Sequence, residues 1–135
     1  MNLGHKLREI AEKDPRYLVE AYEFLFRALD FTMEELNRRD LPDEDSRHIS
    51  AKELLFGIQR YSVQQFGYLA RSVFNHWGVH TTDDFGEIVF NLVENDLLKK
   101  RPEDSREEFA AVYDFEDALD GPALDEVKWA QESKD

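Results

Sequence analysis

The sequence predicts an all-α protein, a compact bundle of about five helices. Apolar residues recur at spacings of three and four along most of the chain, as on the buried faces of helices. Ser or Thr residues followed three positions later by an acid, together with glycines, mark helix starts and ends. With 41% hydrophobic residues and ten Phe among 135 residues, one core can be filled. We expect a single helical domain over residues 1–119 and an acidic C-terminal tail over 120–135.

The first predicted helix is short. Its apolar positions are Leu3, Leu7, Ile10 and Ala11, which share one helical face. The charged residues between them keep the opposite face polar. This amphipathic segment is expected to end near Lys13.

The second helix is expected to run from Arg16 to about Arg38 and to be the longest. Asp14 and Pro15 form a favourable start, because Asp accepts free amide hydrogens and Pro tolerates the first helical position. The stripe of apolar residues consists of Leu18, Tyr22, Leu25, Leu29, Met33 and Leu36. The charged stretch 39–46, which contains a Pro, is predicted to be a surface loop.

The third helix begins at a capping box, in which Ser50 and Glu53 satisfy each other's backbone donors. Its apolar face continues from there to the end of the helix. The residues on that face are Leu54, Leu55, Ile58, Ser62 and Phe66. Gly67 is expected to end or bend this helix.

The fourth helix is predicted from about Tyr68 to Trp77. Gly78 follows it, where a left-handed C-terminal cap favours glycine. Two helices joined by such a short turn resemble a helix-turn-helix unit.

The fifth helix starts at a second capping box, Thr81 with Asp84, and is expected to reach about Leu98. The cations that follow, from Lys99 to Arg101, suit the negative end of its dipole. Carboxylates dominate its surface, which opposes DNA recognition because they would lie against phosphates.

The C-terminal part is less regular. Ser105 and Glu108 fit a third capping box that opens a short helix. Residues 112–115 fit a strand or a loop, so a short strand pair in this segment is an alternative. Residues 120–122 are a turn signal, and the tail beyond them has one potential helical turn around Leu124, Val127 and Trp129.

Two glycines interrupt predicted helices. Gly57 and Gly86 each cost about 1 kcal/mol relative to Ala in a helix interior. We expect one of them to admit a close neighbour, either another helix backbone or an aromatic ring. The candidate rings are those of Phe66, Phe74 and Trp77.

The charge of the chain limits its partners. The formal net charge is −13 and the pI about 4.7, which disfavours nucleic acid and anionic membranes as partners. The chain has no Cys, so no thiolate can serve as nucleophile or metal ligand. The N-terminus does not resemble a signal peptide and no long apolar run occurs, so a cytoplasmic location is expected. No cofactor-binding motif occurs.

Several side chains are candidates for a functional surface. His76 and His80, with Asp84 nearby, have a spacing that a zinc or iron site can use. The turn at Gly78 breaks the register that would align the two rings. Polar or amphipathic residues next to apolar faces are typical of interaction surfaces. The candidate interaction surface comprises His48, Tyr61, Arg71, His76, Trp77 and His80.

The chain also resembles the Minf-type family of small conserved bacterial proteins, over roughly residues 5–119. The resemblance rests on short segments from Asp14 onward. They are Asp14–Tyr17, Glu20–Phe24, Arg47–Ser50, Glu53–Leu55, Gly57–Ile58, Gln65–Gly67, Ala70–Arg71, Trp77–Val79, Thr82, Asp84–Glu94, Asp104–Glu107 and Tyr113–Glu116. It implies one compact unit in a bacterial cytoplasm and transfers no catalytic or binding residue.

Three functions are compatible with these observations. The first is a non-enzymatic protein-interaction or regulatory module, acting on a protein partner or as a homodimer through an apolar surface rimmed by acidic residues. The second is an enzyme or metal-binding protein centred on His76, His80 and Asp84. The third is a nucleic-acid-associated regulator that uses the two-helix unit.

Overall fold

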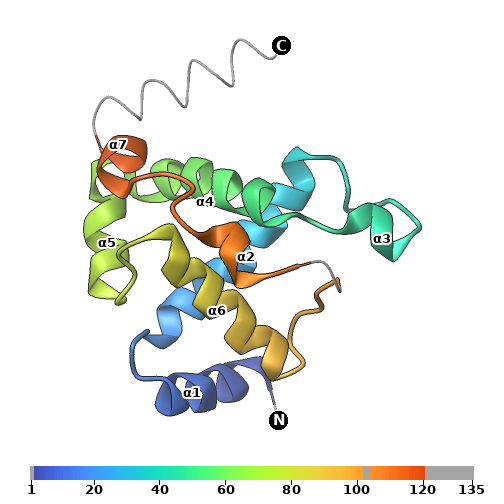
Figure 1. Ribbon diagram of the computed structural model, residues 1–135, viewed down its shortest axis with the longest axis horizontal. Helices are drawn as coiled ribbons and strands as arrows, with labels where there is room; N and C mark the ends of the chain where they lie inside the picture. The colour runs from blue at the N-terminus through green and yellow to red at the C-terminus, as the bar shows by residue number, and fades with distance from the viewer. Residues whose placement is uncertain (1, 102–103, 121–135) are drawn as a thin grey trace.

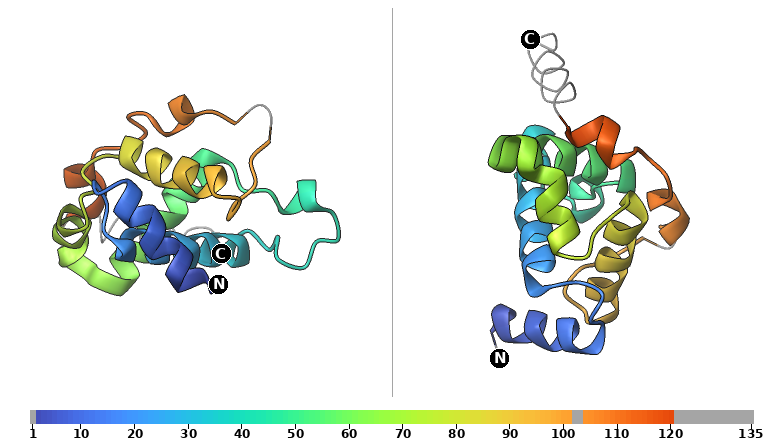
Figure 2. Two further views of the ribbon diagram at one scale, coloured as in Figure 1. Left: turned by 90° about the horizontal axis from the view of Figure 1, so that it is seen from below. Right: turned by 90° about the vertical axis from the view of Figure 1, so that its left-hand side faces the viewer.

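The longest helices, α2 (Val19–Glu35) and α4 (Ala51–Phe66), pack against each other and form the framework of the fold. A computed structural model describes residues 2–101 and 104–120 (Figure 1). Helix α6 (Thr82–Glu94) contacts both framework helices. Helix α1 (Leu3–Lys13) packs against α2 at the end of the molecule where the chain begins (Figures 1 and 2).

Shorter elements complete the bundle. The chain between α2 and α4 contains a single turn, α3 (Glu44–Arg47), which projects from one side of the molecule in Figure 1. A 3₁₀ turn, η1 (Gly67–Leu69), leads directly into α5 (Ala70–His76). The last described elements are η2 (Arg106–Phe109) and α7 (Phe115–Leu119), which pack on α4. Each described helix lacks the length or the apolar character needed to span a membrane.

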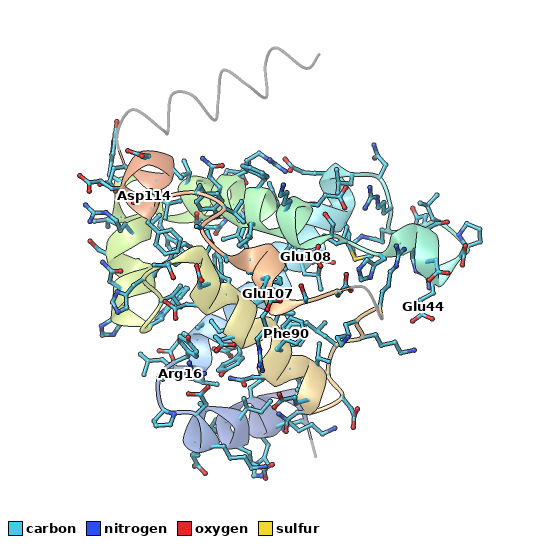
Figure 3. The ribbon with its side chains drawn as sticks, viewed as in Figure 1. Arg16, Glu44, Phe90, Glu107, Glu108 and Asp114 are labelled. Atoms are coloured by element: carbon cyan, nitrogen blue, oxygen red, sulfur yellow. The ribbon has the colours of Figure 1, made fainter. Side chains whose placement is uncertain are left out.

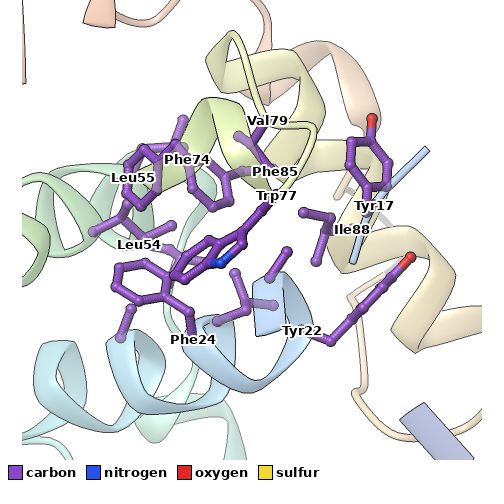
Figure 4. Close-up of a cluster of buried hydrophobic side chains, with 14 of the residues drawn as sticks. Tyr17, Tyr22, Phe24, Leu54, Leu55, Phe74, Trp77, Val79, Phe85 and Ile88 are labelled. Carbon is purple, nitrogen blue, oxygen red and sulfur yellow. The ribbon is translucent and has the colours of Figure 1, made fainter. Parts of the chain in front are cut away.

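An aromatic cluster fills the centre of the core (Figure 4). The Phe24 ring lies 5.3 Å from the rings of both Phe74 and Trp77, and 6.5 Å from that of Phe85, measured between centroids. Phe24, Phe74 and Phe85 are almost completely buried. The predicted apolar stripes therefore converge on one interior, and the all-α fold class is confirmed.

The start of α2 differs from the prediction. Leu18, and not Asp14, is the residue that precedes the first turn, and α2 begins three positions later than expected. Asp14 instead ends α1. Its carboxylate accepts hydrogen bonds from the Arg16 guanidinium and backbone N–H and from Asn91, and so holds the α1–α2 turn and not the first turn of a helix.

The end of α6 also differs. The helix stops at Glu94, because Asp96 adopts a positive φ of 61° and the Leu97 N–H turns back to the Leu92 carbonyl. The predicted end at Leu98 was therefore wrong by four residues. Consequently Lys99 and its cationic neighbours lie beyond the helix and not in its last turn.

The described part of the C-terminal segment contains no strand, so the alternative of a strand pair was wrong for these residues. Residues 112–114 form a loop held by side chains. The Tyr113 hydroxyl donates to the Leu55 carbonyl at 2.6 Å, and Asp114 caps α7. Residues 121–135, with the predicted turn around Trp129, lie outside the described residues.

The three predicted capping boxes are all present, at the starts of α4, α6 and η2. The predicted close approaches at helical glycines are present too: the neighbour of Gly86 is an aromatic ring, as expected, although it is that of Phe109, and the neighbour of Gly57 is a Thr side chain. A side chain at Gly57 would overlap the hydroxyl of Thr32, and one at Gly86 would lie 2.8 Å from the Cβ of Phe109. These glycines let α2 and η2 approach their neighbours.

Candidate functional site

The structure does not bring the six residues of the predicted interaction surface together. Trp77 is buried in the aromatic core and is 9% exposed. Tyr61 is half-buried, with its ring between those of Phe24 and Phe31. Arg71 holds the Asp120 carboxylate at 2.7 Å at the end of the described chain. These three residues serve packing and the attachment of α7, so the surface predicted from residue type is not a continuous one.

His80 and Asp84 form the turn that starts α6, and His76 lies apart from it at the end of α5. The Asp84 carboxylate accepts the backbone N–H groups of His80 and Thr81 at 2.8 and 3.2 Å. The ring Nδ1 of His80 lies 3.0 Å from the Asn75 side-chain oxygen, while His76 is exposed. Within residues 2–101 and 104–120, no group of three or more His, Asp or Glu is arranged to hold a metal ion.

The start of α6 is covered by the chain that follows η2. The Thr82 hydroxyl donates to the Phe109 carbonyl at 2.6 Å and accepts the Val112 N–H at 3.1 Å. The Asp83 carboxylate accepts the Ala111 N–H at 3.1 Å. In a helix-turn-helix protein, this end of the second helix would face the bases. Here it faces the protein's own backbone.

A network of polar side chains, which we call the clasp, joins the α1–α2 turn to α6. It consists of Asp14, Arg16, Tyr17, Tyr22, Asp84 and Asn91. The Tyr17 hydroxyl donates to Asp84 at 2.5 Å. The Asn91 amide donates to the Asp14 carboxylate and to the Tyr22 hydroxyl, both at 2.9 Å.

The clasp shifts the ionisation of its members. Hydrogen bonds from the Arg16 guanidinium hold the pKa of the Asp14 carboxyl well below its usual range. Burial, with the hydrogen bond to Asp84, raises the pKa of Tyr17 far above that of a free tyrosine. Shifts of this kind occur both at functional sites and in structural networks. Here the polar groups are directed at one another, so the clasp holds the α1–α2 turn, α2 and α6 together.

A cleft of about 410 Å³ lies between α2, α4 and α6, and we call it the α2–α4–α6 cleft. Its apolar lining comes from all three helices and from the segments that follow α6. The apolar lining residues include Leu29, Met33, Ile49, Leu54, Val89, Phe90, Leu97, Leu98 and Phe109. Its charged lining residues are Glu44, Arg47, His48, Asp96, Lys99, Lys100, Asp104 and Glu108.

Several of the charged lining residues pair across segments that are distant in sequence. The ring Nε2 of His48 lies 3.1 Å from the Asp104 carboxylate, and both side chains are half-buried. Lys99 lies 3.1 Å from Glu44, where both side chains are largely exposed. Because exposed pairs are weakly held, the His48–Asp104 pair is the better ordered of the two.

Local structure explains why the cleft forms where it does. The Arg38 guanidinium donates two hydrogen bonds to the Glu53 carboxylate, at 2.7 and 2.8 Å, and another to the His48 carbonyl. Burial tends to raise the pKa of Glu53, but the hydrogen bonds from Arg38 and Ser50 outweigh it and lower that pKa. The same contacts fix the chain before α4. The early end of α6 then leaves Leu97 and Leu98 in the opposite wall.

Of the six predicted residues, His48 alone lines this cleft. The sequence does contain a signal for the rest. Ile49, Leu97 and Leu98 are apolar residues in charged stretches near helix ends, and such positions often close a cavity. Leu97 and Leu98 were predicted to lie in the last turn of the fifth helix, so their place in a cleft wall was not expected.

The chain matches no known protein family model, no curated protein and no solved structure. The fold and the cleft define it as an all-α protein with an apolar, charge-rimmed cleft. Its resemblance to the Minf-type family stays a prediction.

Proposed function

We propose that this protein is a non-enzymatic binding module, regulatory in role, and that the α2–α4–α6 cleft is its working site. This keeps the interaction function expected from the sequence and moves it to a different surface. The observation that carries the proposal is a cleft whose apolar lining is only partly buried and stands beside charged residues. A cytoplasmic location, and a protein partner or a second copy as the source of the ligand group, remain predictions.

The size and lining of the cleft support this function. Binding sites for small molecules commonly have volumes of about 300–1,000 Å³ and are mostly apolar with a few polar groups. The cleft of about 410 Å³ fits that description. Leu29, Met33 and Val89 in its wall are only half-buried, so a ligand would remove further apolar surface from water.

The charged rim supports recognition of a ligand by orientation. His48 and Asp104 hold each other, and the Glu108 carboxylate accepts the Ser105 N–H at 3.0 Å. Groups held in this way keep a fixed geometry, which favours selective binding. The cleft is lined by both acidic and basic residues, whereas the sequence predicted an apolar surface rimmed by acidic residues.

A titration with 1-octanol followed by NMR tests the proposal, because this neutral ligand reports on the apolar wall alone. Resonances of Met33, Val89 and Leu98 should shift in a saturable manner. Ala51, half-buried in the wall at the start of α4, is the position for a blocking variant, Ala51→Trp. The matched control is Ser72→Trp, at an exposed position of α5 outside the cleft.

We expect Ala51→Trp to weaken octanol binding at least about tenfold, since the new ring occupies the volume that the ligand needs. Ser72→Trp should bind as the unmodified protein does. Saturable shifts that survive in Ala51→Trp, or an absence of shifts in the folded unmodified protein, would contradict the proposal.

A second candidate function rests on the His48–Asp104 pair. A carboxylate that orients an imidazole beside a cavity is an arrangement used for general-base catalysis. Under this alternative the protein would be an enzyme with His48 as the base, and not one centred on His76 and His80. Hydrolysis of a p-nitrophenyl ester by the unmodified protein but not by His48→Gln would favour it over simple binding.

A further inference from the structure

We infer that the ligand of the α2–α4–α6 cleft is a small zwitterion with an apolar body, the chemical class to which apolar amino acids and short apolar peptides belong. Its carboxylate binds Lys100, its ammonium group binds Glu108, and its body lies against the apolar lining. This inference rests on the proposed function, because it names the class of molecule that the same cleft binds.

The first observation is that the charged lining residues balance once their own pairs are set aside. Lys99 pairs with Glu44, and His48 pairs with Asp104. Two cations and two carboxylates of the lining have no oppositely charged partner among the described residues. They are Arg47, Lys100, Asp96 and Glu108. A ligand with one sign of charge matches only half of this set, whereas a zwitterion matches both halves.

The second observation is that Lys100 and Glu108 lie on the two sides of one peptide group. The Lys100 ammonium donates to the Asp104 carbonyl at 3.5 Å, and the Glu108 carboxylate accepts the Ser105 N–H at 3.0 Å. That carbonyl and that N–H belong to the same trans peptide bond and point in opposite directions. Backbone dimensions therefore place the two charged ends within about 9 Å of each other.

An amino-acid head group fits this separation. Its ammonium nitrogen and carboxylate oxygens are about 3 Å apart, as bond lengths and angles require. Charge-assisted hydrogen bonds of about 2.8 Å at each end extend its reach to about 8–9 Å. One such head can therefore contact Lys100 and Glu108 at once. A short peptide, whose two charged groups are further apart, reaches both as well.

The third observation is that apolar lining residues adjoin both charged groups. Leu97 and Leu98, which are half-buried, precede Lys100 closely in the sequence, and the buried Phe109 follows Glu108 directly. All five residues line the cleft. A ligand held by its two charged groups therefore has apolar side chains beside its body, and its binding removes apolar surface from water.

Four phenylalanine derivatives test whether the cleft recognises both charges. They are L-phenylalanine, its N-acetyl derivative (an anion), its amide (a cation) and the neutral N-acetyl amide. Each is titrated into the full chain at pH about 6, where the α-amino group is protonated, and followed by NMR. We expect phenylalanine to bind about fivefold more tightly than either singly charged derivative, as for partly exposed charge pairs. The neutral derivative should bind most weakly.

Two further probes test the body of the ligand. Glycine carries the same head without an apolar side chain and should bind at least about tenfold more weakly than phenylalanine. Equal binding of glycine would overturn the inference. Leucylphenylalanine shares both charged groups and the apolar character with phenylalanine. The relative affinities of these two identify whether a peptide or a free amino acid is the source.

Charge-removing variants assign the two ends of the ligand. Lys100→Gln should weaken the binding of phenylalanine and of its N-acetyl derivative about fivefold, and should not weaken that of the amide. Glu108→Gln should weaken the binding of phenylalanine and of the amide about fivefold, and should not weaken that of the N-acetyl derivative. Gln in place of Glu108 preserves the capping box. Lys52→Gln and Glu107→Gln are the matched controls, because both residues are exposed and lie outside the cleft lining.

The outcomes separate this inference from the proposed function. Equal affinities of the four derivatives in the cleft would overturn the zwitterion inference and leave the binding module intact. The same holds if Lys100→Gln or Glu108→Gln weakens all four alike, since a residue that only supports the wall behaves in that way. If neither 1-octanol nor any of these probes produces saturable shifts at the cleft, the proposed function fails as well.

Discussion

The clasp and the α2–α4–α6 cleft use different faces of α6 and treat their polar groups in opposite ways. In the clasp, Tyr17 and Asn91 direct their polar atoms at other members of the network. In the cleft, Arg47 and Lys100 face a wall of apolar side chains and are bonded only to carbonyl groups among the described residues. Arg16 of the clasp and Glu44 of the cleft are well separated in Figure 3.

The clasp is a region that stabilises the fold, and the cleft is the region proposed to bind a ligand. Groups that satisfy one another within the protein stabilise the fold and leave nothing for a ligand. The half-buried side chains that line the cleft contribute less to stability than core residues, because part of their apolar surface stays in water. Perturbed ionisation therefore marks the clasp in this protein and not the cleft proposed as the binding site. The shifted groups Asp14 and Tyr17 belong to the clasp.

The largest effect should come from removing a ring of the clasp. Tyr17 is 2% exposed, so Tyr17→Ala deletes a buried aromatic side chain and its hydrogen bond to Asp84. We expect the free energy of unfolding to fall by about 3–5 kcal/mol, measured by urea denaturation. Tyr68→Ala, at a 63% exposed tyrosine, is the control and should change it by less than about 0.5 kcal/mol. A loss below about 1 kcal/mol in Tyr17→Ala would break the comparison.

A smaller loss is expected where α2 and α4 meet beside the cleft. In Gly57→Ala the new methyl group would overlap the buried Thr32 side chain, so the two helices must move apart. We expect a loss of about 1–3 kcal/mol, read from thermal unfolding. Gly4→Ala in α1 meets neighbours no closer than 3.6 Å and should be neutral or stabilising. Unchanged stability in Gly57→Ala would mean that the close approach is unimportant.

The clasp should also show itself in the dependence of stability on pH. The pKa of Asp14 is lower in the folded protein than in the unfolded chain, so its stabilisation is complete above pH about 4 and is lost as the pH falls further. Asp14→Asn should cost about 1 kcal/mol at pH 7, a value that allows for the exposed Arg16 partner. The difference should shrink between pH 4 and pH 2 in urea unfolding curves. Asp40→Asn, at an exposed carboxylate, serves as the control, and a difference that grows on acidification would contradict the assignment.

The smallest effect on stability is expected in the cleft wall. Met33→Ala removes a half-buried side chain and should lower the free energy of unfolding by less than about 1 kcal/mol. Leu25→Ala on the same helix, at a fully buried position, should cost about 2–5 kcal/mol. Octanol affinity should change in Met33→Ala, since a contact with the ligand is lost. Comparable losses of stability in the two variants would show that the wall is as well packed as the core.

Much of the local structure was predictable from short-range signals. The capping boxes at Ser50, Thr81 and Ser105 are present because the paired side chains are three residues apart and find each other without help from the rest of the fold. Gly67 and Gly78 adopt positive φ, as expected for glycines at helix ends. The prediction of Asp14 as a helix cap was wrong, because Arg16 and the distant Asn91 bind its carboxylate.

The candidate site was less predictable. His48 was expected at a functional surface, but its partner Asp104 is far away in the sequence and nothing local identifies it. Trp77 was expected at the same surface because of its residue type, although its ring fits into the aromatic core beside Phe24. Residue type favours an interface or a core for such a side chain equally, and packing decides between them.

The sequence by itself determined the helical class, the helix starts that carry a capping box and the apolar faces that had to be buried, because periodicity and capping depend on residues within a few positions of each other. Tertiary structure alone decided that Asp14, Tyr17 and Asp84 would form the hydrogen bonds of the clasp. It also left Met33 and Val89 half-buried in the wall of the cleft. The physical reason is that hydrogen-bond partners and cavities are set by the way helices distant in sequence pack together.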